Sequence, residues 1–140
     1  MNKVAIVYWS GTGNTAAMAE AVADGAKQKG AETSVFTAAE FSGDMVKNFD
    51  AIAFGCPSMG SEELEDSEFQ PMFEGCKPYL KEKKIALFGS YGWGDGEWMR
   101  NWEENCLSEG FTLVSDCVIC NEAPDDDAVS ACKALGEALA

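Results

Sequence analysis

Short uncharged runs alternate along the chain with longer segments that carry spaced apolar residues, and this alternation predicts a succession of strands and helices. Runs such as 4–7 and 51–55 contain small or β-branched apolar residues and no charge, which is typical of strands covered on both faces of a parallel sheet. The expected strands are 4–7, 32–37, 51–55, 85–89 and 111–119. The expected helices are 16–30, 42–47 (the weakest), 71–80, 97–108 and 125–139.

Strands that alternate with helices in this way predict an α/β fold, in which helices cover both faces of a parallel sheet. A chain of 140 residues fits one domain, 1–140, which buries about two-thirds of the surface that its unfolded chain would expose. No Pro/Gly/Ser-rich spacer, internal repeat or low-complexity tract divides the sequence.

Three of the expected strands run directly into loops rich in glycine and serine, at 10–15, 56–62 and 90–96. In open α/β sheets, ligands bind beyond the carboxyl ends of the strands. The first loop offers hydroxyl and amide donors, the second a methionine, and the third a tyrosine and a tryptophan. We therefore expect an anionic tail at the first loop and a flat ring between the other two.

The first loop has the residues of a phosphate site. Its uncharged donors and glycines are Ser10, Gly11, Thr12, Gly13, Asn14 and Thr15. An expected helix begins directly after them, and a helix N-terminus attracts anions. No Lys or Arg occurs between 4 and 26, which argues against an ATP or GTP loop of the Walker type. Gly11-x-Gly13-x-x-Ala16 matches the dinucleotide fingerprint loosely, but the hydroxyls favour a terminal phosphate; an ordinary hydroxyl-rich helix cap is the alternative.

The composition excludes several kinds of chemistry. The chain has no histidine, which removes Ser-His-Asp and Cys-His nucleophilic sites and imidazole metal ligands. Cys117-x-x-Cys120 is the only close pair among six cysteines, and it lies at the end of the apolar stretch that is expected to form the strand 111–119. Residues three apart on a strand point to opposite faces, so reduced thiols in packing roles are expected rather than a shared metal or a redox pair.

The net charge of −14 bears on the partners of the protein. Nucleic acids and anionic membranes would repel such a chain, whereas a basic partner protein would attract it. The apolar run near the N-terminus is too short for a signal peptide or a membrane span, so a cytoplasmic protein is expected.

Three segments carry a resemblance to a known family: Tyr8-Trp-Ser-Gly-Thr-Gly-Asn-Thr15, Gly55-Cys-Pro-Ser-Met-Gly-Ser-Glu-Glu63 and Gly89-Ser-Tyr-Gly-Trp-Gly-Asp-Gly-Glu-Trp98. In order and at the expected strand ends, they closely resemble the three flavin-contacting loops of the short-chain flavodoxins, especially those of anaerobic bacteria. The likeness covers nearly the whole chain, and the fifth strand has no long insertion. The resemblance implies a flavodoxin-like three-layer sandwich with a five-stranded sheet of order 2-1-3-4-5.

The resemblance also implies a noncovalently bound FMN that carries single electrons, mainly between semiquinone and hydroquinone, with a strongly reducing second couple. The implied phosphate contacts are Ser10, Gly11, Thr12, Gly13, Asn14 and Thr15. The implied contacts to the rest of the cofactor are Pro57, Ser58, Met59, Gly60, Ser61, Glu62, Ser90, Tyr91, Gly92, Trp93 and Trp98.

Some of these residues have a specific implied role. Trp93 would stack on the outer face of the isoalloxazine ring and Met59 would lie against its inner face. Glu62 would accept a hydrogen bond from N3, the amides of 90–92 would face the pyrimidine edge, and the Gly60–Ser61 peptide would turn a carbonyl toward N5. Each assignment has an alternative: Met59 as a gap filler, Glu62 as a solvated acid, and the aromatic residues Trp9, Tyr91, Trp93 and Trp98 as packing residues.

The resemblance implies an electron-transfer protein rather than an enzyme, working as a monomer. Acidic residues in 62–68, 95–97 and 125–127 would surround the exposed flavin edge and steer a basic redox partner. Two other functions stay open from the sequence: an FMN-dependent quinone or nitro reductase, and a nucleotide-binding regulatory domain. The second is disfavoured because Gly55 and Cys56 stand at the end of the third strand, where such a domain carries an Asp.

Overall fold

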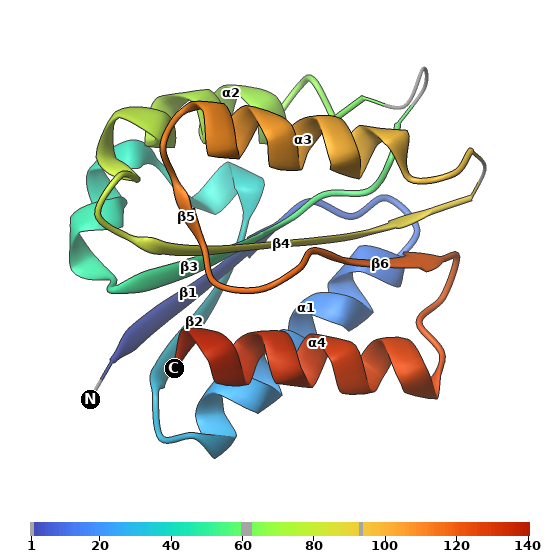
Figure 1. Ribbon diagram of the computed structural model, residues 1–140, viewed down its shortest axis with the longest axis horizontal. Helices are drawn as coiled ribbons and strands as arrows, with labels where there is room; N and C mark the ends of the chain where they lie inside the picture. Colours follow the sequence, from blue (N-terminus) through green and yellow to red (C-terminus); the bar gives the residue numbers. More distant parts are fainter. Residues whose placement is uncertain (1, 60–62, 93) are drawn as a thin grey trace.

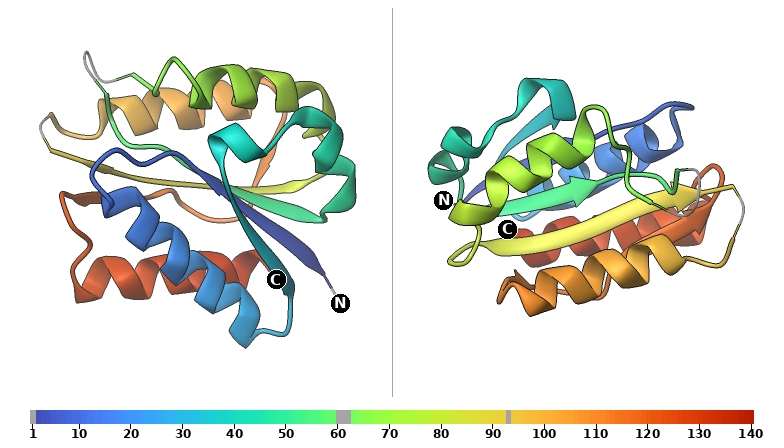
Figure 2. Two further views of the ribbon diagram at one scale, coloured as in Figure 1. Left: turned by 180° about the vertical axis from the view of Figure 1, so that it is seen from behind. Right: turned by 90° about the horizontal axis from the view of Figure 1, so that it is seen from above.

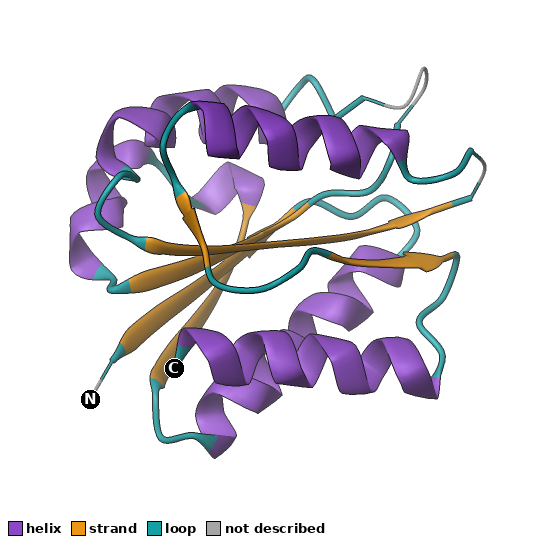
Figure 3. Ribbon diagram, in the orientation of Figure 1, coloured by secondary structure: helices purple, strands orange, loops and turns teal. Residues whose placement is uncertain are grey.

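The computed structural model describes residues 2–59, 63–92 and 94–140. The strands are β1 (Lys3–Tyr8), β2 (Glu32–Thr37), β3 (Ala51–Gly55), β4 (Lys84–Tyr91), β5 (Thr112–Leu113) and β6 (Val118–Asn121). The α-helices are α1 (Asn14–Gln28), α2 (Phe69–Cys76), α3 (Glu97–Ser108) and α4 (Asp126–Leu139). Three short 3-10 helices, η1 (Ala38–Glu40), η2 (Gly43–Asn48) and η3 (Lys77–Tyr79), complete the described elements (Figure 3).

The strands form one parallel sheet of order β2-β1-β3-β4-β5, which confirms the expected topology. Helices α2 and α3 cover one face, and α1 and α4 cover the other, so the molecule has three layers (Figures 1 and 2). Each layer boundary is an apolar core. Ile52 and Phe54 of β3 face the α2/α3 core, and Ala51 and Ala53 face the α1/α4 core.

The expected fifth strand, 111–119, is divided into two short strands. Both pair with β4 in parallel: Leu113 lies opposite Ile85, and Val118 lies opposite Phe88. Between these two pairs the chain has four residues, 114–117, where β4 has only two, 86–87. The two extra residues interrupt the hydrogen-bond ladder with β4. As a result β6 pairs with the last part of β4 and carries the chain to the edge of the sheet where the loops meet.

Two expected helices differ from the structure in kind or extent. The weak segment near 42–47 is the 3-10 helix η2, and the segment expected at 71–80 consists of α2 followed by η3. α2 begins at Phe69 because the buried carboxylate of Glu65 accepts hydrogen bonds from the Glu68 and Phe69 amides, at 2.7 and 2.8 Å. None of the described helices is long and apolar enough to cross a membrane.

Helices α1 and α4 pack unusually closely, because each carries a glycine at the crossing. A Cβ atom on Gly136 would lie 1.9 Å from the carbonyl oxygen of Val22, and one on Gly25 would lie 2.0 Å from that of Lys133. The two helices therefore form a fixed layer, and α1 presents its N-terminus at the carboxyl edge of the sheet (Figure 1).

Candidate functional site

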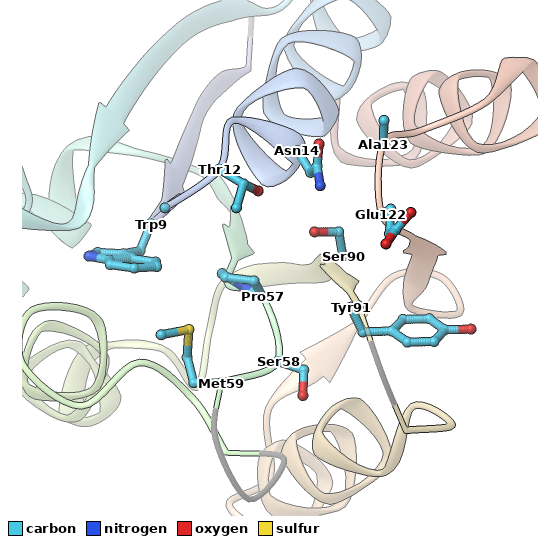
Figure 4. A pocket seen from close by; sticks show the side chains of 12 residues that line it. Trp9, Thr12, Asn14, Pro57, Ser58, Met59, Ser90, Tyr91, Glu122 and Ala123 are labelled. Atoms are coloured by element: carbon cyan, nitrogen blue, oxygen red, sulfur yellow. The ribbon is translucent and has the colours of Figure 1, made fainter.

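The carboxyl ends of β1, β3, β4 and β6 meet around one cavity of about 500 Å³, within the usual range for cofactor sites. Its described lining residues are Trp9, Gly11, Thr12, Asn14, Pro57, Ser58, Met59, Ser90, Tyr91, Gly92, Glu122 and Ala123 (Figure 4). The three loops that the sequence indicated thus come together, and a fourth loop after β6 joins them. The last two lining residues were not predicted.

The first loop is folded around the Ser10 side chain. Ser10 Oγ accepts hydrogen bonds from the Gly13 and Ala16 amides, at 3.1 and 3.3 Å. An oxygen that accepts twice still has its own proton to donate. Gly13 is the N-cap of α1, and no acidic residue lies in the first helical turn, so the partial positive charge of the helix end is available to an anion.

Thr15 ties this loop to β4. Its side chain is 1% exposed, and Oγ1 lies 3.4 Å from Ser90 Oγ across the base of the cavity. Thr15 and Ser10 are not among the residues that line the 500 Å³ cavity, whereas Thr12 and Asn14 are. The hydroxyls of Ser10 and Thr15 therefore support the loop, whereas the Thr12 and Asn14 residues line the cavity with a hydroxyl and a carboxamide.

The second loop supplies an apolar wall. Pro57 and Met59 line the cavity, and Met59 is held by backbone hydrogen bonds to and from Glu63, at 2.8 and 3.4 Å. The Ser58 amide donates to the Ser90 carbonyl oxygen at 3.0 Å, which joins this loop to the third. Ser58 Oγ is buried and has no hydrogen-bond partner within the described part of the chain. This hydroxyl lies in a cavity-lining residue, where a bound molecule or water can supply a partner.

Trp9 forms another wall, which the sequence could assign either to the site or to the core. Its indole Nε1 donates to Glu68 Oε1 at 3.0 Å. A Cβ atom on Gly11 would lie 3.2 Å from the Trp9 ring, so the glycine allows the indole to lie against the first loop. The indole and Tyr91 flank the cavity from opposite sides (Figure 4).

Glu65 anchors the far end of the second loop. Its carboxylate, in a residue that is only 5% exposed, accepts hydrogen bonds from the Ser67 side chain and from the amides of Ser67, Glu68 and Phe69. Burial alone raises the pKa of this carboxyl, but those hydrogen bonds outweigh burial and lower the pKa to about 2. The Glu65 amide in turn donates to Cys56 Sγ at 3.3 Å, so both ends of the loop are tied to one another.

Trp98, which was expected to contact the cofactor, lies behind the cavity wall. Its side chain is 2% exposed, and Nε1 donates to the Cys56 carbonyl oxygen at 3.1 Å. Its ring lies 5.6 Å from that of Tyr91, so Trp98 supports a lining residue. Gly89 makes room for this contact, because a Cβ atom there would lie 2.1 Å from the same carbonyl oxygen.

Four of the expected site residues, Gly60, Ser61, Glu62 and Trp93, lie outside the described residues. Their assignments to N3, N5 and the outer ring face therefore stay predictions.

The described wall of the cavity carries no positive charge. Glu122 is its only ionisable acid or base, apart from the Tyr91 phenol, and exposed acids such as Glu63, Glu68 and Asp95 stand nearby in sequence on the same loops. Arg100 is paired with Asp95 at 3.0 Å. An anion bound in this cavity would therefore be held by dipoles and uncharged donors.

The described residues contain no group of three or more side chains suited to hold a metal ion. All six cysteines are free, and the pair Cys117 and Cys120 packs on opposite sides of the sheet, against Glu103 and Met18 respectively. Burial raises the pKa of the Cys56, Cys76, Cys106 and Cys132 thiols to about 12, which suits packing rather than redox chemistry.

Glu122 and Ala123 were missed because their loop lacks the glycine and serine residues that marked the other three. The available signal was the position of residues 121–124 shortly after the end of the expected strand 111–119.

Comparison with known proteins gives a consistent result. The family model described as Flavodoxin matches residues 6–135. The chain is 48% identical to a flavodoxin from Megasphaera elsdenii over 98% of both sequences, and 43% identical to one from Clostridium beijerinckii over 96% of this chain and 97% of the other. A solution structure of two-electron reduced M. elsdenii flavodoxin superimposes with a TM-score of 0.89 over 97% of each chain, at 48% identity. An archaeal flavodoxin structure gives a TM-score of 0.84 at 30% identity, over 98% of this chain and 95% of that one.

Proposed function

Because this chain belongs to the flavodoxin family, we propose that it binds FMN noncovalently and carries single electrons between redox partner proteins. It would cycle mainly between the semiquinone and hydroquinone states of the flavin and perform no net catalysis on a substrate. The single observation that supports this best is the cavity at the carboxyl edge of the sheet, with uncharged donors at one end and apolar walls at the other.

The residues of the cavity fit FMN in their chemistry. Thr12 and Asn14 beside the N-terminus of α1 suit a phosphate, and the apolar part of the cavity that Trp9, Met59 and Tyr91 line suits a ring. The unpartnered Ser58 hydroxyl adds a polar group that a ligand can satisfy. When bound, FMN supplies the one-electron chemistry that side chains lack.

The protein would set the potential of the flavin through charge. One acid about 10 Å away, at an effective dielectric near 60, disfavours an added negative charge by ~0.5 kcal/mol, which is ~20 mV for one electron. Several exposed acids around the cavity, together with a phosphate that no cation neutralises, would lower the second potential by on the order of 100 mV.

The same acids would form the docking surface for a basic partner. Exposed carboxylates on the described loops and on the start of α4 stand at the edge of the sheet where the cavity opens: Glu63, Glu68, Asp95, Glu97, Glu122, Asp125, Asp126 and Asp127. Charges so placed speed association with a basic protein surface, and salt weakens the effect. Rates of electron transfer should therefore fall as ionic strength rises.

The proposal is tested by the visible spectrum of the purified protein and by its acid extract. We expect a yellow protein that releases one equivalent of a flavin containing phosphate, and an apoprotein that takes up added FMN. Neither NADH nor NADPH should reduce a quinone when mixed with the protein alone. A colourless protein that fails to bind FMN would refute the proposal, and rapid quinone reduction by a nicotinamide would favour a reductase.

A further inference from the structure

A second cavity, of about 300 Å³, lies between α2 and α3 on the face of the sheet that these two helices cover (Figure 2). It is separate from the proposed FMN site, because the described residues that line the two cavities are all different. Trp98 and Trp102 of α3 form its floor, and these two residues are only 2% and 3% exposed. Trp102 in turn packs edge-on against Phe69 of α2, with ring centroids 5.4 Å apart, so the core holds the floor in place.

The rim of this second cavity is polar, and its described residues carry no positive charge. Three exposed carboxamides line it: Gln70 of α2, and Asn101 and Asn105, which are four positions apart and lie on one face of α3. Glu63 adds a carboxylate, and no ion pair in the described chain involves it. Trp102 Nε1 is buried, so it offers no donor to a bound group. The rim can therefore present one negative charge and three amide oxygens.

These groups suit a cationic ligand that donates several hydrogen bonds. A carboxylate only accepts hydrogen bonds, and a carboxamide can turn its oxygen toward a donor. Indole rings also attract cations rather than anions. A planar guanidinium has five donors in a fixed fork and can meet several oxygens at once, whereas an ammonium group has three donors around a point charge. The volume is at the lower end of the range for ligand sites, which suits one side chain better than a whole cofactor.

The second cavity shares a wall with the proposed FMN site. Glu63 exchanges backbone hydrogen bonds with Met59, at 2.8 and 3.4 Å, and Met59 lines the larger cavity. Trp98 lies in the floor of the smaller cavity, and its ring is 5.6 Å from that of Tyr91, which lines the larger one. A side chain bound in the second cavity would thus lie directly beside the loops that are proposed to contact the flavin.

We propose that the cavity between α2 and α3 binds one arginine side chain of a redox partner protein. The guanidinium donates hydrogen bonds to the Glu63 carboxylate and to the carboxamide oxygens above the indole floor. The identity of the partner rests on the proposed function, whereas the choice of a guanidinium rests on the cavity alone. The exposed acids at the carboxyl edge of the sheet attract a basic surface in general, and this cavity fixes where one of its side chains docks.

The test uses the purified full chain with its flavin and a small probe, N-acetylarginine methylamide. Binding is followed by the side-chain amide signals of Gln70, Asn101 and Asn105 in heteronuclear NMR spectra of isotope-labelled protein. These signals should shift in a saturable way, with a dissociation constant in the millimolar range. The citrulline analogue, which has the same shape and no charge, should bind about tenfold more weakly. The lysine analogue should also bind more weakly, because its ammonium group meets fewer oxygens.

Matched variants locate the site. Glu63→Gln keeps the shape of the side chain and removes its charge, so it should weaken the arginine probe about fivefold and the citrulline probe less than about twofold. Asn105→Leu keeps the size of the side chain and removes an amide oxygen, so it should also weaken the arginine probe. Glu104→Gln is the control, because it removes an equal charge from an exposed position of α3 that does not line the cavity. It should leave the binding of every probe unchanged.

Three outcomes would overturn the inference: no saturable shift, equal binding of the arginine and citrulline probes, or equal losses in Glu63→Gln and Glu104→Gln. A lysine probe that binds as tightly as the arginine probe would overturn the choice of a guanidinium. A chain that binds no FMN would refute the proposed function instead. It can still be titrated with the probes, so the two failures are distinct.

Discussion

Trp9 Nε1 donates a hydrogen bond of 3.0 Å to Glu68 Oε1, and this contact joins the loop after β1 to the N-cap residue of α2. The two residues are 59 positions apart in the chain and belong to different βα units. The Trp9 indole lines the cavity, whereas the Glu68 carboxylate that accepts its hydrogen bond is not part of the cavity lining. The bond therefore sets the angle at which the ring of Trp9 meets a ligand.

Trp9→Phe should loosen this wall. The substitution keeps most of the ring and removes the N–H donor, and the loss of one net hydrogen bond, about 1 kcal/mol, corresponds to a roughly fivefold rise in the FMN dissociation constant. Trp102→Phe is the matched control, because Trp102 Nε1 is buried and has no partner within the described chain. Titration of both apoproteins with FMN would measure the difference, and equal constants would show that the Trp9 bond contributes nothing to binding.

Glu65→Gln should reduce the stability of the protein in a way that depends on pH. The Glu65 pKa is lowered from 4.5 to about 2 in the folded protein, so the ionised carboxylate stabilises the fold above pH 4.5. That contribution, of order 3 kcal/mol, is lost as the pH falls through about 2. Urea unfolding of wild type and variant should therefore differ most near pH 6 and converge toward pH 2. Asp66→Asn, at the exposed neighbouring position, should leave a much smaller difference at every pH.

The sequence predicted those features that repeat a local pattern. The apolar runs located the strands, and the glycine and serine residues that follow three of them located three walls of the cavity. The interruption at 114–117 has one local signal in the sequence, the polar pair Ser115 and Asp116, but the extra length of this segment exists only in the register with β4. A hydrophobic pattern indicates which face of a strand is buried, but it does not identify which residue of the neighbouring strand lies opposite.

The positions of three residues in or behind the cavity wall depend on long-range contacts that the sequence does not give. Glu65 is one of several acids in a row, and only the fold distinguishes the buried cap of α2 from its solvated neighbours. Trp98 lies beside Tyr91 in space, but its N–H is directed to Cys56 because the end of β3 lies next to β4. Glu122 reaches the cavity because β6 pairs with the end of β4.

Gly136→Ala should destabilise the protein severely for a change of one methyl group. The new Cβ would meet the backbone oxygen of Val22 at 1.9 Å, and backbone atoms cannot rotate away as a side chain can. Moving α1 from α4 should cost about 3 kcal/mol. Gly75→Ala is the control, since that glycine also lies in a helix but has nothing within 4 Å of the added carbon. It should stabilise α2 by about 0.5–1 kcal/mol, so thermal unfolding of the two variants should shift in opposite directions.

Ser10→Ala distinguishes a phosphate site from an ordinary helix cap. In either case the variant loses the acceptor for the Gly13 and Ala16 amides, so the apoprotein should become less stable by about 1 kcal/mol. If the hydroxyl also donates to a phosphate, FMN binding should weaken about tenfold while riboflavin, which has no phosphate, is affected less than twofold. The comparison uses one variant and two ligands, so a general loosening of the loop would weaken both flavins alike. An equal loss of affinity for both flavins would show that Ser10 is a capping residue only. The phosphate contacts would then be assigned to Thr12 and Asn14, which line the cavity.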